Sequence, residues 1–179
     1  MATTASLGGF RVFSTCPPSN FAKPATYLED VRLVAKWSED AGCDGTLVYT
    51  DNGLVDPWLA AQVVIQATDR LAPLVAVQPI YMHPYSVAKM VWTYAFLHGR
   101  GVALNMVAGG FKTDLLALDD PTPHDRRYDR LVEYTEIITR LLKGAEPVTF
   151  EGDFYRVKNL KMPSPLPADL FPAITVSGS

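Results

Sequence analysis

The sequence predicts an α/β fold of the (β/α)₈, TIM-barrel type, of which these 179 residues supply about five parallel strands, four helices and a small β-hairpin. Short apolar runs alternate with helical patterns four times, which is typical of parallel strands joined by helical crossovers. The runs are continuously apolar, which indicates strands buried on both faces. A doubly wound open sheet is the alternative, but FSTCPPSN, at the end of the first strand, lacks the glycine fingerprint of that fold.

Apolar runs and capping residues define the first two strand–helix units. We expect strands at 10–15 and 45–50 and helices at 27–42 and 57–69. Thr26 and Asp56 are good N-caps for these helices, and Pro57 suits a first helical position. The residues expected to form the buried face of the first helix are Leu28, Val31, Val34, Ala35 and Ser38.

The later elements follow the same pattern with two additions. Strands are expected at 71–81, 101–107 and 171–179, helices at 83–100 and 124–144, an irregular insertion at 109–123 and a hairpin at 148–157. The last helix carries an amphipathic stripe formed by Tyr128, Leu131, Tyr134, Ile138, Leu141 and Leu142.

The number of strands falls short of a complete barrel, which has eight strands in about 250 residues. We therefore expect residues 1–179 to form a single barrel domain that is truncated after strand five. Open strands at both sides would expose backbone and apolar surface, so a second chain that covers them is the other expectation, and with it a homo-oligomer.

Composition excludes several classes of protein. The net charge is −3, without the basic surplus that nucleic acid or an anionic membrane would require. Cys16 and Cys43 have neither metal-ligand spacing nor the density of a secreted disulfide scaffold, and we find neither a signal peptide nor a spanning segment, so a cytoplasmic protein is expected. We find no Ser/His/Asp triad, phosphate-binding loop or metal cluster, which argues against a hydrolase, an NTPase and a metalloenzyme.

Polar residues at the carboxyl ends of the strands are the candidate site, because barrel enzymes carry their chemistry there. Asn105 interrupts the apolar strand 101–107, where an inward amide would offer donors and acceptors to a ligand; a buried amide bonded to backbone is the alternative. Thr50 ends strand two and could contact cofactor or substrate; a plain turn is the alternative. His83 follows strand three, either as a pocket wall or acid/base group or as an ordinary loop histidine.

Two further features concern backbone and charge. Gly109, after strand four, would let the backbone approach a planar ring, although a plain turn is the alternative. Tyr128 lies in the first turn of the last helix, where free N–H groups favour an anion such as phosphate. The alternative for Tyr128 is that it simply heads the apolar stripe.

Six stretches in order carry a resemblance to a known family: GTLVYTDNGLVDPWLAA, RLAPLVAVQP, GRGVALNMVAGG, HDRRYDRLVEYTEIITRLLKG, VTFEGDFYRVKNLKM and PAITVSGS. They resemble the bacterial luciferase-like flavin-dependent monooxygenases, and most of all the alkanesulfonate monooxygenase branch. The resemblance implies an oxidoreductase in which reduced FMN, supplied by a separate flavin reductase, reacts with molecular oxygen to give a C4a-peroxyflavin that oxygenates a small organic substrate.

The same resemblance implies roles for particular residues. Asn105, Ala108 and Gly109 would lie beside the flavin ring, and Tyr128 and Ser179 near the FMN phosphate. Leu54 departs from the cysteine that the sulfonate enzymes share, so the substrate stays open. Two other readings also stay open: a non-catalytic half-barrel that acts through self-association or a partner chain, and a deazaflavin-dependent oxidoreductase.

Overall fold

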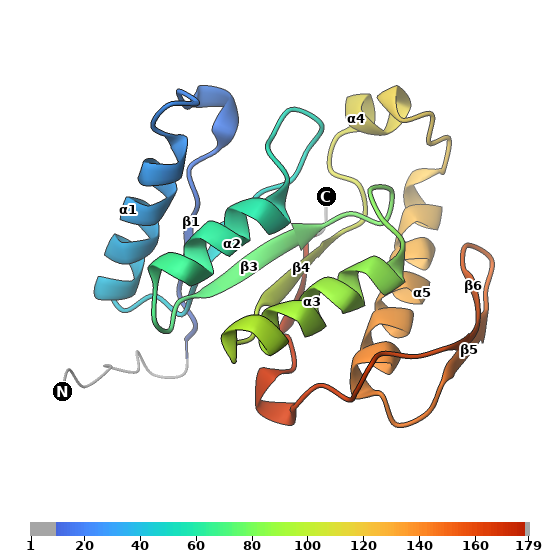
Figure 1. The fold of residues 1–179 in the computed structure, drawn as a ribbon. Coiled ribbons are helices and arrows are strands. Elements are labelled where there is room, and N and C mark those ends of the chain that lie inside the picture. The colour runs from blue at the N-terminus through green and yellow to red at the C-terminus, as the bar shows by residue number, and fades with distance from the viewer. Residues whose placement is uncertain (1–9, 178–179) are drawn as a thin grey trace. The chain divides into compact units, whose positions relative to one another are not determined.

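The computed structural model describes residues 10–177, which form two compact units that divide between Ala76 and Val77 (Figure 1). Each unit is described by itself. Ser179, which the resemblance places near the FMN phosphate, lies outside the described residues.

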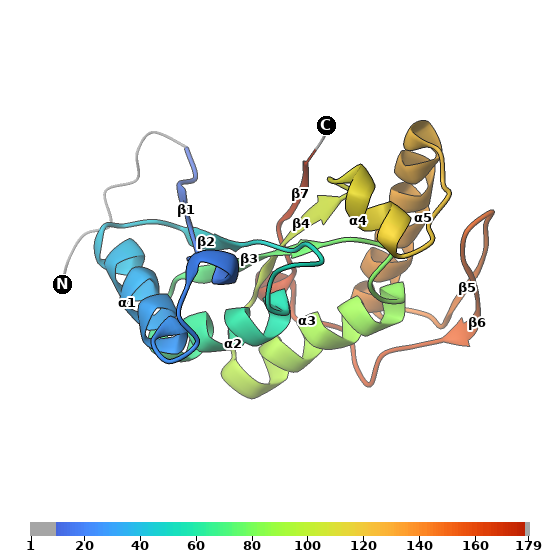
Figure 2. The same cartoon turned by 90° about the horizontal axis from the view of Figure 1, so that it is seen from above.

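The first unit contains parallel strands covered by two helices. Its elements are β1 (Phe13–Thr15), a 3-10 turn (Ser19–Phe21), α1 (Tyr27–Asp40), β2 (Gly45–Val48), α2 (Pro57–Ala67) and β3 (Ala72–Val77). β1 pairs in parallel with β2, and β2 with β3. Helices α1 and α2 pack against each other and cover one face of these strands (Figure 2). This confirms the predicted strand–helix alternation.

Helix capping in the first unit follows the sequence closely at α2 and less closely at α1. The Asp56 carboxylate accepts hydrogen bonds from the backbone N–H groups of Trp58 and Leu59, as an N-cap does. Thr26 occupies the N-cap position of α1 without a side-chain cap bond. The predicted buried face of α1 is wrong at Leu28, which is 53% exposed, because it lies in the first turn, ahead of the buried Val31.

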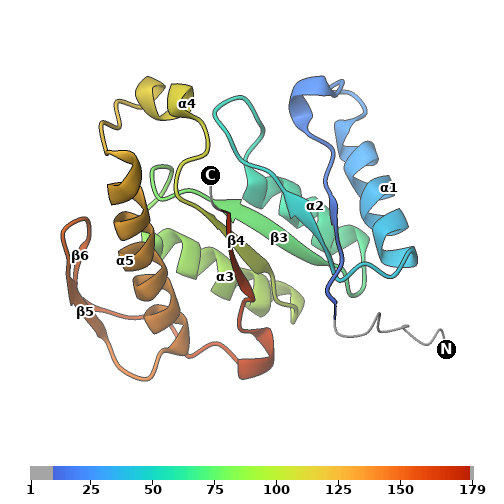
Figure 3. The ribbon, with the colours of Figure 1, turned by 180° about the vertical axis from the view of Figure 1, so that it is seen from behind.

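The second unit contains two parallel strands, three helices and a hairpin. Its elements are α3 (Pro84–His98), β4 (Ala103–Val107), α4 (Lys112–Ala117), α5 (His124–Lys143), β5 (Val148–Glu151), β6 (Arg156–Leu160), a 3-10 turn (Ala168–Leu170) and β7 (Ile174–Ser177). β4 and β7 are parallel, and β5 and β6 form the predicted antiparallel hairpin. Figure 3 shows β7 beside β4, seen from behind.

One prediction for this unit is wrong. The insertion at 109–123, expected to be irregular, contains the helix α4, so the described residues hold five α-helices instead of four. Six residues are too few to show a helical period in the sequence. The helix has one buried anchor, Leu115, which is 2% exposed.

Helix α5 supplies the core of the second unit. The predicted stripe is confirmed from Leu131 onward, since its later members are at most 4% exposed, whereas Tyr128 at its start is only half-buried. Burial of each such side chain stabilises the fold by about 2 kcal/mol. Gly144 then ends the helix with a φ of 58°, a conformation that glycine adopts without steric cost. Within residues 10–177, none of the helices is long and apolar enough to cross a membrane.

Candidate functional site at the end of β4

Asn105 is held in β4 by two hydroxyl groups of the neighbouring strand. Its Oδ1 accepts hydrogen bonds from Ser177 Oγ at 2.9 Å and from Thr175 Oγ1 at 3.1 Å. Asn105 is only 9% exposed, so these bonds compensate for the burial of its oxygen. An amide whose oxygen is engaged in this way has its N–H groups left as hydrogen-bond donors.

The loop after β4 reaches the start of α5. Ala108 and Gly109 are buried, and Gly109 has a φ of 131°, which requires glycine. A Cβ at Gly109 would lie 3.0 Å from the Leu115 side chain. Arg127 joins the two segments, since its Nε donates to the Thr122 carbonyl at 3.0 Å and its Nη1 makes a long contact of 3.5 Å to the Gly109 carbonyl. The structure thus brings Gly109 to the helix turn that carries Tyr128.

The first turn of α5 lacks a capping side chain. Pro123 occupies the N-cap position and has no side-chain acceptor for the first N–H groups of the helix. Tyr128 is the fifth residue of α5 and so lies just past the first turn; it is half-buried, with its ring centroid 5.4 Å from that of His124. The dipole and the backbone N–H groups at the start of this 20-residue helix favour an anion, whereas the carboxylate of Asp125 in the same turn opposes one.

A buried ion pair, which the sequence did not indicate, fixes the approach to this turn. Arg130 Nη2 lies 2.7 Å from Asp120 Oδ2, and the two side chains are 10% and 4% exposed. Asp120 Oδ1 also accepts from the Thr122 hydroxyl at 2.5 Å and from the Thr122 N–H at 3.1 Å. Burial raises the pKa of Asp120, but the hydrogen bonds from Arg130 and Thr122 outweigh it and lower the pKa below its ordinary value. The carboxylate is therefore ionised at neutral pH.

His83 is placed as a helix cap at the start of α3. Its Nδ1 accepts the backbone N–H of Tyr85 at 3.2 Å, which assigns the remaining proton of a neutral ring to Nε2. The ring is exposed and meets the edge of Tyr155 at 6.0 Å between centroids. The Tyr134 hydroxyl donates to the Met82 carbonyl at 2.9 Å and so fixes this loop. Of the two ring nitrogens of His83, Nε2 is therefore the one that remains available for proton transfer.

Thr50 belongs to the first unit, where it is half-buried in the segment that follows β2. Asn105, Ala108, Gly109 and Tyr128 all lie in the second unit and are connected through β4, its loop and α5. Among residues 10–177 there is no group of three or more His, Cys, Asp or Glu side chains that could hold a metal ion.

Two parts of the site escaped the sequence prediction. The hydroxyls of Thr175 and Ser177 lie 70 and 72 residues from Asn105, so their pairing with it depends on the register between β4 and β7. The alternation of polar and apolar residues in ITVS was a usable signal, because it puts both hydroxyls on one face of the strand. The Asp120–Arg130 pair had no comparable signal.

A family model and a curated relative both assign this chain to the same family. Residues 10–179 match the model of the luciferase-like monooxygenase family. The chain is 34% identical over 154 residues to 4-(gamma-L-glutamylamino)butanoyl-[BtrI acyl-carrier protein] monooxygenase BtrO from Niallia circulans, a match that covers 86% of this chain and 45% of the relative. The chain thus spans about half the length of this curated relative.

Two solved structures have the same fold. EDTA monooxygenase EmoA from Chelativorans sp. BNC1 superposes with a TM-score of 0.79 at 17% identity, over 94% of this chain and 49% of that one. Riboflavin lyase RcaE, whose structure is described with modified FMN and riboflavin, superposes with a TM-score of 0.77 at 21% identity. This match covers 95% of this chain and 50% of that one. These matches confirm the predicted fold class, an incomplete barrel, and at this identity they concern the fold alone.

Proposed function

Because this chain belongs to the luciferase-like monooxygenase family, we propose that it is the FMN-binding first part of a monooxygenase that oxygenates a small organic substrate with molecular oxygen. The observation that carries the proposal is that Asn105 Oδ1 is engaged by Thr175 and Ser177. The N–H groups of this amide are then left to donate to a ligand.

The residues of the site fit a flavin in three respects. The Asn105 amide offers N–H donors to the acceptor atoms along the edge of a flavin ring. Gly109 lacks the Cβ that would crowd the loop beside β4. The start of α5, near Tyr128, offers the positive end of a helix dipole to the phosphate of FMN. Reduced FMN would supply the electrons with which molecular oxygen is activated.

The contribution of the chain itself is to bind and orient. Asn105 would fix the ring through Nδ2, and the Asp120–Arg130 pair would hold the loop that leads into the phosphate-binding turn. The buried surroundings of Asn105 and Ala108 would exclude water from the face of the ring that they contact. His83, through Nε2, stays a predicted proton donor or acceptor. Delivery of reduced FMN by a separate flavin reductase, self-association and a cytoplasmic location also stay predictions.

Anaerobic titration with reduced FMN tests the proposal. We expect saturable binding to the wild-type chain. Asn105→Leu should weaken FMN binding by about tenfold, because it removes one well-placed hydrogen bond and puts an apolar group in its place. Gln66→Leu, which makes the same chemical change at an exposed position on α2, is the matched control and should bind as the wild type does. Absence of saturable binding to the wild type would refute the proposal.

A deazaflavin is the second candidate cofactor. One solved structure of the same fold is described as an F420-dependent secondary alcohol dehydrogenase. With this cofactor the same site would serve hydride transfer rather than oxygenation. Parallel titrations with reduced FMN and with F420 separate the candidates, because the preferred cofactor is identified by its own absorption spectrum in the bound state.

Apolar side chains on the strands favour a third candidate, a half-barrel that acts through self-association. Val176 of β7 is 63% exposed, and Val12, just before β1, is 40% exposed. Sedimentation velocity tests this function: a monomer at all concentrations would exclude it, whereas self-association without FMN binding would favour it over the enzyme.

A further inference from the structure

A pocket lies between the two loops that follow β1 and β2, within the first unit. We call it the loop pocket; its lining includes Ser19, Ala22, Pro24, Tyr27, Leu54 and Val55, and its volume is about 470 Å³. This volume is in the range of sites for small molecules. Both loops leave the carboxyl ends of parallel strands, where barrel enzymes bind their substrates.

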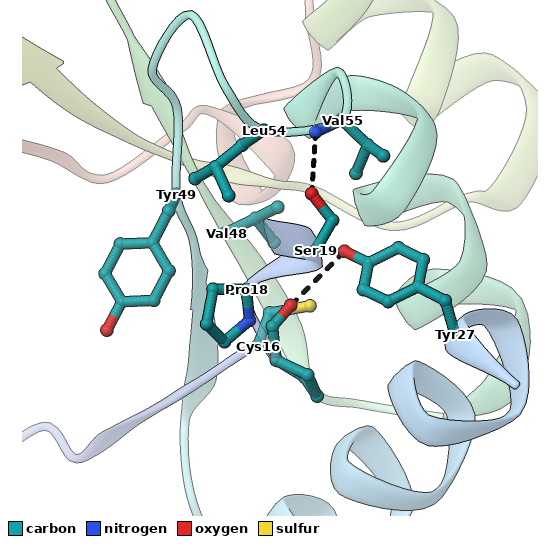
Figure 4. Close-up of a pocket in the computed structure, with 9 residues that line it drawn as sticks. Cys16, Pro18, Ser19, Tyr27, Val48, Tyr49, Leu54 and Val55 are labelled. Atoms are coloured by element: carbon teal, nitrogen blue, oxygen red, sulfur yellow. Dashed lines mark hydrogen bonds between the residues drawn. The ribbon is translucent and has the colours of Figure 1, made fainter. Parts of the chain in front are cut away.

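A second, much smaller pocket shares lining residues with the loop pocket and is shown in Figure 4; we call it the inner end. The inner end shares Ser19, Tyr27, Leu54 and Val55 with the wider part. It is also lined by Cys16, just after β1, and by Val48, the last residue of β2, and its volume is only about 10 Å³. Leu54 and Val55 are thus apolar walls of both parts.

The polar atoms of the loop pocket already have partners in the protein. Ser19 Oγ accepts the Val55 N–H at 3.0 Å, which ties the two loops together, and the Tyr27 hydroxyl donates to the Pro17 carbonyl at 3.2 Å (Figure 4). Burial raises the pKa of the Cys16 thiol to about 11 and that of Tyr27 to about 12, so both are neutral near pH 7. None of the lining residues in either part is charged.

We propose that the loop pocket binds a neutral, apolar segment of the organic substrate, an inference that rests on the proposed monooxygenase function. An apolar chain gains from burial against Ala22, Pro24, Leu54 and Val55. A sulfonate or carboxylate would lose its hydration and find no cation in the lining with which to pair. The pocket thus selects uncharged over anionic substrates for the segment that it holds.

Binding of a matched pair of probes to the whole chain tests this inference. The probes are 1-octanol and 1-octanesulfonate, which have the same alkyl chain and differ in charge. With methyl-labelled protein followed by NMR, we expect octanol to shift the Leu54 and Val55 methyl signals saturably. Octanesulfonate should bind at least about tenfold more weakly, because its charged group would have to be desolvated at the mouth or left outside it.

Two variants make the test specific to the loop pocket. Leu54→Gln should weaken octanol binding by about fivefold, because it replaces an apolar wall with an amide. Leu59→Gln makes the same change at a position on α2 that is 71% exposed and does not line the pocket, and it should bind octanol as the wild type does. Equal affinity for the two probes, or unchanged octanol binding by Leu54→Gln, would overturn the proposal.

The experiment also separates this inference from the function on which it rests. Octanol binding is measured without flavin, and FMN binding is measured without octanol. A chain that binds FMN but not octanol refutes the loop pocket as a substrate site and leaves the monooxygenase proposal intact. In a chain that binds octanol at Leu54 but not FMN, the loop pocket is a neutral-ligand site and the monooxygenase proposal fails.

Discussion

Ser177 Oγ donates a hydrogen bond of 2.9 Å to Asn105 Oδ1 across the parallel pair β4 and β7. Thr175 Oγ1 makes the second such bond at 3.1 Å. An asparagine amide has one acceptor oxygen and two N–H donors, so occupation of the oxygen decides which chemistry the residue offers to a ligand. Thr175 and Ser177 thus act as positioning residues for Asn105.

The first prediction concerns this pair of hydroxyls. The double variant Thr175→Val, Ser177→Ala frees Asn105 to rotate. Reduced FMN should bind about thirtyfold more weakly, because two hydrogen bonds of about 1 kcal/mol each no longer hold the amide. Titration of the variant beside the wild type measures this. Ser177→Thr keeps a hydroxyl and should retain most of the affinity.

Thr93→Val is the matched control for that experiment. The Thr93 hydroxyl bonds to the Lys89 carbonyl of its own helix, α3, so its loss should leave FMN binding unchanged. If the double variant binds FMN as tightly as the wild type while Asn105→Leu does not, the amide is positioned by something other than β7.

The second prediction concerns the buried pair of Asp120 and Arg130. Asp120→Ala leaves the Arg130 guanidinium buried without its counter-charge, and its Nε already has no hydrogen-bond partner among the described residues. We expect the free energy of unfolding to fall by about 3 kcal/mol, measured by urea denaturation at pH 7.

Asp125→Ala is the control for the pair, because the Asp125 side chain is fully exposed. It should change the free energy of unfolding by less than about 0.5 kcal/mol. An equal loss in both variants would show that the Asp120–Arg130 bond does not stabilise the loop into α5.

The sequence predicted most of the backbone because the signals were local. The stripe of α5 has a helical period over 20 residues, and Asp56 followed by Pro57 marks the start of α2 at the correct residue. Asn105 was recognised because a polar residue in an apolar strand is costly unless it has partners. Which partners it has depends on β7, about 70 residues later, and a strand register is not encoded locally.

The features that were missed have the same origin. Asp120 lies in a segment rich in proline and aspartate, which reads as a turn, and only the folded chain brings it to Arg130. The loop pocket likewise forms from residues such as Ala22 and Leu54, which are ordinary in sequence and are joined by the bond between Ser19 and Val55. Sites made by contacts between loops are therefore found from structure.

The third prediction is a pH dependence that Glu39 produces. Its carboxylate accepts the backbone N–H groups of Asp69, Arg70 and Leu71 at 2.7 to 3.2 Å. Burial raises the pKa of Glu39, but these N–H groups and Lys36 outweigh it and lower the pKa below the ordinary value of 4.5. The carboxylate therefore stabilises the fold above pH 4.5, and this contribution is lost as the pH falls through the lowered pKa.

Urea denaturation across pH measures the contribution of Glu39. Glu39→Ala should lower the free energy of unfolding by about 3 kcal/mol at pH 7, because three backbone N–H groups lose their acceptor. The difference from the wild type should shrink below pH 4.5. Asp40→Ala, which removes a carboxylate that is 64% exposed and also lies near Lys36, should have little effect at any pH. A difference for Glu39→Ala that grows toward low pH would contradict this account.

The last prediction concerns the two thiols. Cys16 is 3% exposed and its pKa is raised to about 11 by burial, whereas Cys43 is half-buried. Only the thiolate is alkylated, and at pH 8 about one Cys16 in a thousand is ionised. Iodoacetamide should therefore modify Cys43 first, and Cys16 at least about 100-fold more slowly.

In the Cys43→Ser variant, intact mass should show almost no adduct at pH 8 until urea unfolds the chain. Rapid alkylation of folded Cys43→Ser would show that the inner end of the loop pocket is open to solvent.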